Sequence, residues 1–306
     1  MNSLVKVFAG LSIATVLAGS AFSKDLTPVR VAEVSPIAPY WPSYIAQEKG
    51  FYEKHGVAVT VTLAGSPANT AQQLVAGAFD FASTTFDTAA RVAAAGAKLH
   101  WVGGTAAKYA HSIMVAPGIK TAADLKGKTI SLSFQKDLTT SMWKRWLQAQ
   151  GVKPEEVDSI FDGSSANRYA ALSTKTVAGA MLSQPFDLRA LADGNMKIVD
   201  LGQFEPNFIF LGFVANESWL KSNPDAARGF LTAQAEATDW FYDIKNRPEA
   251  IEILMKATKL DRPTVEATYD YYANDLRPFA KNLQISEASA KLEIAELVKL
   301  GEISSE

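Results

Sequence analysis

The chain of 306 residues is long enough for two domains, and its 48% hydrophobic and 20% charged residues are typical of a folded globular protein. Thirty basic residues against 32 acidic ones, without a basic run, argue against a nucleic-acid-binding surface. The chain contains no cysteine, which excludes disulfides, thiol nucleophiles, zinc–thiolate sites and iron–sulfur clusters. Its three histidines, His55, His100 and His111, lie far apart, so we expect no metal site.

Residues 1–23 have the pattern of an export signal. Lys6 precedes an apolar run, Val7–Gly19, and Ala21 and Ser23 place small residues at the positions that signal peptidase requires. The run is shorter than the roughly 20 apolar residues of a membrane-spanning helix. We therefore expect cleavage after Ser23 and a soluble periplasmic protein, which without a cysteine cannot carry the thioether-linked lipid of a lipoprotein. A buried N-terminal helix is the alternative.

Strand and helix patterns then alternate along most of the chain. The expected strands are Val29–Val34, Val57–Leu63, Phe79–Ser83, Leu99–Val102, Ile113–Val115, Thr129–Ser133, Val157–Phe161, Val177–Leu182, Lys197–Leu201 and Phe208–Ala215. The expected helices between them are Ser43–Lys49, Ala68–Ala76, Thr85–Ala95, Thr139–Gln150, Ala166–Ser173 and Phe186–Ala192. From Glu217 onward the pattern is helical, with starts near Pro224, Pro248, Pro263 and Ser286.

This order predicts an α/β fold of two lobes with mainly parallel sheets around a ligand cleft, followed by a helical C-terminal segment. Pro117-Gly118 marks the expected crossing between lobes. The order of elements resembles the plan of type II periplasmic binding proteins, in which the chain leaves lobe 1, builds lobe 2 and returns to lobe 1. This resemblance implies that lobe 1 comprises residues 24–116 and 208–306 and that lobe 2 comprises residues 117–207. Two blocks of similar pattern, Leu74–Gly96 and Leu172–Gly194, are consistent with lobes that present equivalent loops to one cleft.

Four segments resemble signatures of the nitrate/sulfonate/taurine-type binding proteins of ABC transporters. They are Pro42–Val57, Leu74–Ala82, Gly96–Lys98 and Asp124–Ile130, the last being similar to the D-L-K-G-K-x-V motif that opens lobe 2 of type II periplasmic binding proteins. The resemblance implies a monomeric capture protein for a small solute, with a permease and ATPase of the inner membrane as partners and with no cofactor. One position departs from the family pattern: Ala178 stands where relatives often have an aspartate.

In open α/β sheets, ligands bind at the carboxyl ends of strands, where helix N-termini offer free N–H groups. The loops at these positions supply the candidate ligand-binding residues Tyr40, Trp41, Tyr44, Ser66, Asn69, Thr84, Thr85, Phe86, Ser133, Gln135, Lys136, Arg168 and Gln184. The first three lie in or next to a loop stiffened by three prolines, which would hold their rings against the solute. Packing under the following helix is the alternative for these rings.

Two cations among these candidates favour an anionic ligand. Lys136 and Arg168 lie near helix starts, and a guanidinium can bind a carboxylate or sulfonate with two hydrogen bonds. We therefore expect a small organic anion with an apolar or aromatic body. The alternative is a neutral heteroaromatic solute such as a pyrimidine vitamin precursor, for which Asp87 and Gln184 would matter more. Surface exposure of Arg168, simple N-capping by Ser66 and helix-dipole support by Asp87 remain open as structural roles.

Two other classes of protein share this pattern. A periplasmic sensor partner would bind a solute in the same way but signal to a receptor. The fold family also includes a pyrimidine-forming enzyme with a catalytic histidine and a cysteine-rich motif. Because this chain has no cysteine, and no histidine beside an acid in a strand-end loop, we expect binding without catalysis. We expect His111 to be a packed or surface histidine.

Overall fold

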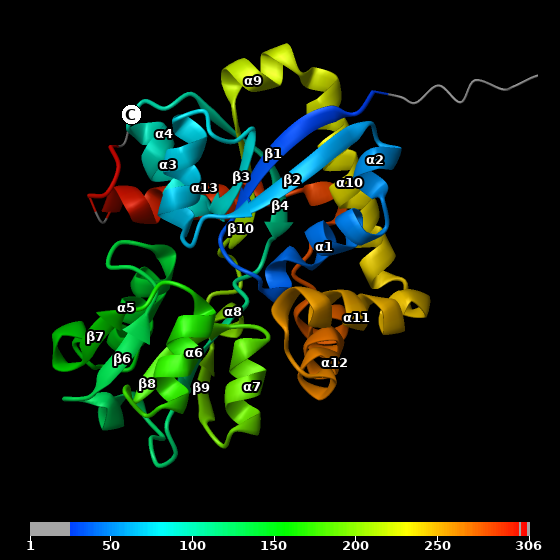
Figure 1. The fold of residues 1–306 in the computed structure, drawn as a ribbon. Helices are drawn as coiled ribbons and strands as arrows, with labels where there is room; N and C mark the ends of the chain where they lie inside the picture. The colour runs from blue at the N-terminus through cyan, green and yellow to red at the C-terminus, as the bar shows by residue number, and fades with distance from the viewer. Residues whose placement is uncertain (1–24, 300, 305–306) are drawn as a thin grey trace, which may run out of the picture.

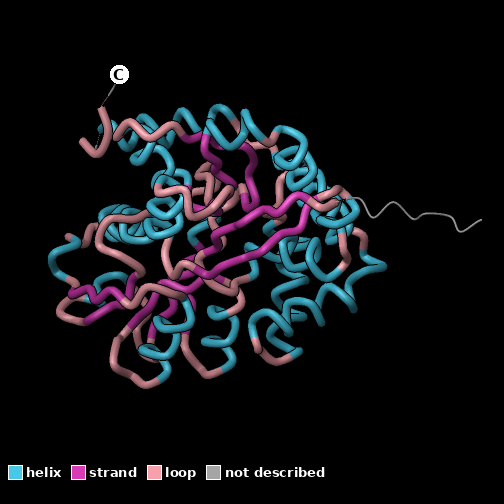
Figure 2. Tube along the Cα trace, turned by 45° about the horizontal axis from the view of Figure 1, so that its top comes forward, coloured by secondary structure: helices cyan, strands magenta, loops and turns pink. Residues whose placement is uncertain are grey.

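The computed structural model describes residues 25–299 and 301–304, so the predicted signal peptide lies outside the described residues. The chain forms two α/β lobes, each built on a five-stranded sheet. Helices surround the strands of both sheets, and the green lobe lies below the blue one in the first view (Figures 1 and 2). This arrangement confirms the predicted fold class.

The sheet of lobe 1 has the strand order β2-β1-β3-β10-β4. Its strands are β1 (Thr27–Glu33), β2 (Val57–Leu63), β3 (Phe81–Thr85), β4 (Leu99–Ala106) and β10 (Leu211–Asn216). β1 runs parallel to β2 and β3, whereas β10 is antiparallel to both of its neighbours. The other four strands share one direction, and β10 runs opposite to them. β10 is the strand with which the chain re-enters lobe 1 after lobe 2.

The sheet of lobe 2 repeats this plan, in the order β7-β6-β8-β5-β9. Its strands are β5 (His111–Val115), β6 (Thr129–Leu132), β7 (Asp158–Phe161), β8 (Gly179–Ser183) and β9 (Met196–Asp200). β5 is antiparallel to β8 and β9. We expected β5 in lobe 1, but its pairing places the first crossing at residues 107–110 rather than at Pro117-Gly118. A short buried strand has the same apolar pattern in either sheet, so its sequence does not identify its partners.

The helices follow the predicted order. Lobe 1 carries α1 (Trp41–Glu48), α2 (Phe51–Lys54), α3 (Pro67–Val75) and α4 (Phe86–Ala94); lobe 2 carries α5 (Leu138–Ala149), α6 (Ser165–Ser173), α7 (Phe186–Ala192) and α8 (Leu201–Phe204). The C-terminal helices are α9 (Glu217–Ser222), α10 (Pro224–Tyr242), α11 (Arg247–Thr258), α12 (Arg262–Asp270) and α13 (Glu287–Lys299). Proline occupies the first turn of α10, α11 and α12, where its missing N–H costs no helical hydrogen bond.

The C-terminal helices pack mainly on lobe 1. α10 contacts α1 and α2, and α13 contacts α4 on the opposite side of the lobe (Figure 1). Gly229 permits the close approach of α10, because a Cβ there would lie 2.4 Å from the backbone oxygen of His55. α12 also reaches α7 of lobe 2. The helical tail therefore completes lobe 1 and also contacts lobe 2.

Apolar packing continues from one lobe to the other. Ile37 and Tyr40, which follow β1, are buried in the same cluster as Phe210 and Leu211 and the core of lobe 2. The backbone N–H of Ala38 also donates to the backbone oxygen of Gln184 at 3.1 Å. The lobes therefore touch where the loop after β1 meets lobe 2. Within residues 25–299 and 301–304, no helix has the length and apolar character needed to cross a membrane.

Candidate functional site

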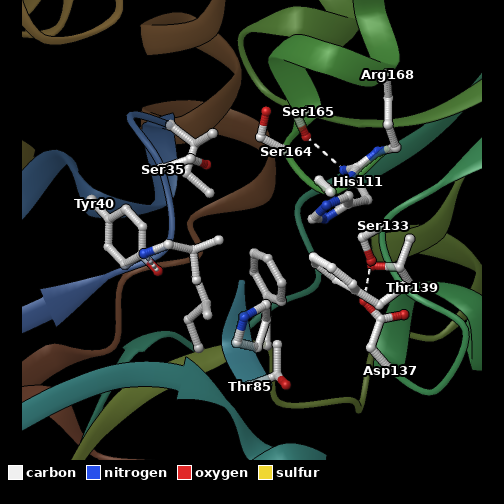
Figure 3. A pocket seen from close by; sticks show the side chains of 17 residues that line it. Ser35, Tyr40, Thr85, His111, Ser133, Asp137, Thr139, Ser164, Ser165 and Arg168 are labelled. Carbon is white, nitrogen blue, oxygen red and sulfur yellow. Dashed lines mark hydrogen bonds between the residues drawn. The ribbon is translucent and has the colours of Figure 1, made fainter. Parts of the chain in front are cut away.

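A cavity lies between the two lobes, and both contribute to its wall. Lobe 1 supplies Val34, Ser35, Ile37, Tyr40, Pro67 and Thr85; lobe 2 supplies His111, Ser133, Phe134, Asp137, Thr139, Gly163, Ser164, Ser165 and Arg168; Phe210 and Leu211 complete it at the second crossing. Figure 3 shows Ser35, Tyr40 and Thr85 facing the lobe 2 residues across this space. The centre of a water-sized sphere can occupy about 40 Å³ of it. In this conformation the cavity is suited to a ligand of few atoms.

The cavity lies where strands end and helices begin. Ser133 follows β6, and Ser164 and Ser165 stand at the start of α6. Ser164 caps α6 by accepting the Asn167 N–H at 3.3 Å. The partial positive charge of this N-terminus therefore lies at the cavity wall, where it favours an anionic group.

Arg168 on α6 is buried, with 3% of its surface exposed. Its Nε donates to the Met181 oxygen at 2.5 Å, one terminal nitrogen donates to the Gly163 oxygen, and the other donates to Ser165 Oγ at 2.8 Å. Burial lowers the pKa of Arg168 to about 10, so the guanidinium remains charged at neutral pH. A guanidinium has five N–H groups. Three of them have partners among the described residues, and two have none there and can donate to a ligand.

Asp137 supplies the negative charge that balances Arg168. One carboxylate oxygen accepts the Thr140 N–H at 3.0 Å, and the other accepts the hydroxyl of Ser133. Burial raises the pKa of Asp137, partly offset by these hydrogen bonds. One oxygen therefore caps the start of α5, the other holds the loop after β6, and both have protein partners.

His111, at the start of β5, is packed between aromatic rings, as one of the two expected placements had it, and it also forms part of the lobe 2 wall. Its ring stacks on Tyr109, with 4.6 Å between centroids, and meets the edge of Phe210 at 4.9 Å. Only 5% of its surface is exposed, and its Nδ1 has no hydrogen-bond partner among the described residues. Burial, together with the charge of Arg168, lowers the pKa of His111 well below its usual range.

The lobe 1 wall is mainly apolar. Tyr40 is 1% exposed, and its hydroxyl accepts the Val34 N–H at 3.3 Å. Burial raises the pKa of Tyr40, so the phenol stays neutral. Thr85, at the end of β3, donates its hydroxyl to Thr88 Oγ1 at 2.9 Å. This wall can contact the apolar part of a ligand while the lobe 2 wall binds its polar part.

Four of the predicted residues line the cavity: Tyr40, Thr85, Ser133 and Arg168. Trp41 does not. Its side chain is fully buried in lobe 1, its Nε1 donates to the Ala250 oxygen at 2.8 Å, and its ring lies 5.0 Å from that of Phe241. α11 and the C-terminal helices cover Trp41, so packing accounts for this residue.

Three further predicted residues do not line the cavity and have structural partners instead. The Tyr44 hydroxyl accepts the Ile37 N–H at 3.2 Å, which holds the loop that carries Tyr40. Phe86 packs edge-on against Trp101 at 5.2 Å. The buried amide of Gln184 donates to Asp187 at 2.9 Å.

Ser66, Asn69 and Thr84 shape the loop before α3. Ser66 caps α3 by accepting the Asn69 N–H at 3.0 Å, which is the N-capping role given above as the alternative to ligand binding. The Asn69 amide donates to the Ala64 oxygen at 3.1 Å. Thr84 donates to the oxygen of Pro67 at 3.0 Å. Of this loop, Pro67 is the residue that reaches the cavity wall.

Gln135 and Lys136 are exposed, and they lie along an open groove between α5 and the C-terminal segment that contains α13. They therefore point away from the cavity, although they are neighbours of Ser133 in sequence. The N-cap role of Asp137 explains this orientation, because the loop must place Asp137 against the first turn of α5.

The cavity also contains residues that were not predicted individually. Ser164 and Ser165 lie in a loop whose sequence indicates the start of a helix. Phe210 and Leu211 belong to an apolar run typical of any buried strand, so their sequence gives no indication of a ligand site. His111 could have been found only from the pairing of β5. Within residues 25–299 and 301–304, no three carboxylate or imidazole side chains converge as metal ligands.

Comparisons with known proteins agree with this architecture. A protein of Brucella abortus strain 2308 that is named a putative binding protein is 26% identical over 268 residues, which cover 85% of this chain and 81% of that protein. The nitrate/nitrite binding protein NrtA of a Nostoc species is 27% identical over 141 residues, which cover 44% of this chain and 31% of that protein.

Two solved structures show the same fold. The alkanesulfonate-binding protein SsuA of Xanthomonas axonopodis pv. citri, bound to MOPS, has a TM-score of 0.75 and 19% identity, covering 90% of this chain and 93% of its own. The periplasmic nitrate-binding protein NrtA of Synechocystis PCC 6803 has a TM-score of 0.75 and 19% identity, covering 92% and 83%. Residues 39–251 match the family described as NMT1/THI5 like. The chain therefore belongs to the NMT1/THI5-like family and has the two-lobed fold of periplasmic binding proteins.

Proposed function

We propose that this protein is the solute-binding component of an ABC importer, which captures a small organic anion between its lobes and delivers it to a permease of the inner membrane. The observation that carries the proposal is the cavity between the lobes, with Arg168 and the start of α6 at one wall and Tyr40 at the other. The family membership and the fold support a binding role. A sulfonate or an aliphatic or aromatic carboxylate has the required combination of charge and apolar body.

The preference for an anion rests on Arg168. It is the permanently charged cation among the described cavity residues, and two of its N–H groups are free of protein partners. The N-terminus of α6 adds partial positive charge at the same wall. Lys136 lies in the outer groove, so it does not contribute the second positive charge that the sequence suggested.

A neutral heteroaromatic ligand, such as a pyrimidine vitamin precursor, is the second candidate. The rings of Tyr40, Phe134 and Phe210 at the cavity wall favour it, because they could pack on a flat solute. However, Asp87 and Gln184, which such a ligand would need as hydrogen-bonding groups, do not lie on the wall of this cavity. The anion is therefore the better match to the geometry.

Capture would involve closure of the lobes about the crossings at residues 107–110 and 205–210. Closure removes the ligand from water, strengthens its hydrogen bonds, and creates a shape that a permease can recognise. We propose that the protein acts in the periplasm as a monomer, with the permease and ATPase as its partners. A sensor role would use the same cavity and a receptor in place of the permease, and a pyrimidine-synthase-like activity is the least favoured alternative.

A ligand panel tests this function. Thermal unfolding is measured with nitrate, short sulfonates, aliphatic and aromatic carboxylates, and neutral pyrimidines, and each ligand that raises the melting temperature is titrated by calorimetry. We expect 1:1 binding of an organic anion without chemical turnover. Arg168→Ala should abolish this binding, whereas the matched variant Lys136→Ala should retain it. Unchanged anion binding by Arg168→Ala, or consumption of the solute by the purified protein, would overturn the proposal.

A further inference from the structure

His111 is one of the residues that line the cavity, and one nitrogen of its ring, Nδ1, is buried without a hydrogen-bond partner among the described residues. Buried polar atoms almost always have a hydrogen-bond partner, and an unpaired one carries a free-energy cost. Nδ1 of His111 has no hydrogen-bond partner among the described residues, and only 5% of the residue's surface is exposed. A ligand that contacts the ring from the cavity can supply a hydrogen-bond partner that the protein does not.

The imidazole is held in a defined orientation. Tyr109 stacks on its face, at an interplanar angle of 15°, and Phe210 meets it at 88°. Figure 3 places the ring beside the Arg168 guanidinium on the lobe 2 side of the cavity. A group fixed in this way loses little conformational freedom when it binds a ligand, so its hydrogen bond contributes to selectivity.

The imidazole also stays neutral. The charged groups nearest to it at the cavity wall are Arg168 on α6 and Asp137 before α5, and the carboxylate of Asp137 is already engaged by Ser133 and Thr140. A neutral imidazole has one donor nitrogen and one acceptor nitrogen. Among the described residues, Nδ1 has no partner that would fix which of the two roles it takes. A ligand hydroxyl can donate or accept, so it can pair with a nitrogen of this ring in either tautomer.

We propose, on the basis of the proposed anion-binding function, that His111 binds a hydroxyl group of the ligand while Arg168 and the start of α6 bind its anionic group. The cavity therefore selects short organic anions that carry a hydroxyl group over the same anions without one. Sites that hydrogen-bond a hydroxyl reject analogues lacking it, because the buried protein group is then left unpaired.

Calorimetric titration with two pairs of probes tests this selectivity. The pairs are 2-hydroxyethanesulfonate with ethanesulfonate, and lactate with propionate. We expect the wild-type protein to bind at least one hydroxylated probe at least about tenfold more tightly than its partner. His111→Phe keeps a ring between Tyr109 and Phe210 but removes the hydrogen bond. It should reduce the preference of the hydroxylated probe over its partner to less than about threefold.

A second measurement on the wild-type protein removes any dependence on folding of the variant. The chain has three histidines, so ¹⁵N-histidine labelling gives three assignable imidazole rings, with His55→Gln and His100→Gln as assignment variants. The hydroxylated probe should shift the His111 nitrogens by more than the unsubstituted probe does. If the two members of each pair bind equally or shift His111 equally, the hydroxyl proposal is wrong while anion binding stands. If neither pair binds, both proposals fail for these anions.

Discussion

Arg145 on α5 of lobe 2 lies 2.9 Å from Glu296 on α13, a helix that packs against α4 of lobe 1. The same guanidinium lies 2.6 Å from Glu205, near the second crossing. An ion pair between lobes stabilises the arrangement in which the lobes are close together, and separation of the lobes would break it. α13 therefore links lobe closure to the C-terminal end of the chain.

Glu296→Gln should weaken ligand binding without touching the cavity. Partly exposed ion pairs contribute about 0.2–1 kcal/mol, so we expect the dissociation constant to rise by up to about fivefold. The physical reason is a smaller population of the closed form. Calorimetry measures the affinity, and small-angle scattering measures the separation of the lobes. Lys291→Gln, which removes an exposed pair within α13, is the control and should change neither.

Arg168→Lys separates charge from geometry. The ammonium keeps the positive charge but cannot donate to Met181, Gly163 and Ser165 from the positions of the guanidinium fork. We expect binding of ethanesulfonate to weaken by about 10- to 150-fold, because a hydrogen bond to a charged group contributes about 1.5–3 kcal/mol. The free energy of unfolding should also fall, by about 1–3 kcal/mol, since buried carbonyls lose their donors. Wild-type affinity in this variant would show that charge alone matters.

Trp41→Phe should affect stability and leave ligand binding unchanged. The substitution leaves the buried oxygen of Ala250 without its donor, which costs about 1–3 kcal/mol of unfolding free energy. Chemical denaturation measures this loss, and calorimetry should give a dissociation constant close to that of the wild type. The neighbouring variant Tyr40→Ala changes a cavity residue and should weaken binding. Weak binding by Trp41→Phe with unchanged stability would contradict the placement of Trp41 in the core.

The buried carboxyl of Glu33, at the end of β1, should make the free energy of unfolding depend on pH. Its side chain is fully buried, and burial raises its pKa from 4.5 to about 8, with partial compensation by Ser43. Between these pH values the folded protein retains a proton that the unfolded chain releases. The free energy of unfolding should therefore decrease as the pH rises from 4.5 to 8, with a slope of up to about 1.4 kcal/mol per pH unit.

Glu33→Gln should make this slope smaller and increase stability at pH 8, because the amide does not ionise. Glu293 on α13 contributes in the same sense, since burial raises its pKa to about 9, so part of the slope should remain. Denaturation series at pH 5, 6.5 and 8 provide the measurement. Glu53→Gln, on the exposed face of α2, is the control and should leave the slope unchanged. An equal slope in Glu33→Gln would show that the carboxyl is not buried in the folded protein.

Much of the fold could be predicted from local patterns. The alternation of Val57–Leu63 predicted β2, and Pro224, Pro248 and Pro263 marked the starts of α10, α11 and α12. Such signals depend on residues that are neighbours in the chain, so they are readable without a structure. The sequence pattern did not indicate that β5 belongs to lobe 2, because its partners β8 and β9 are far away in the chain.

The same distinction between local patterns and distant contacts applies to the site. The sequence alone determined that helix starts would gather at the carboxyl ends of strands and that Arg168 and Ser133 would stand there. Only the tertiary structure decided that Trp41 packs in the core, that Lys136 faces the outer groove and that His111 lies on the cavity wall. A loop side chain takes its direction from what packs around it, and those partners, such as Ala250 for Trp41 and Phe210 for His111, come from segments far away in the chain.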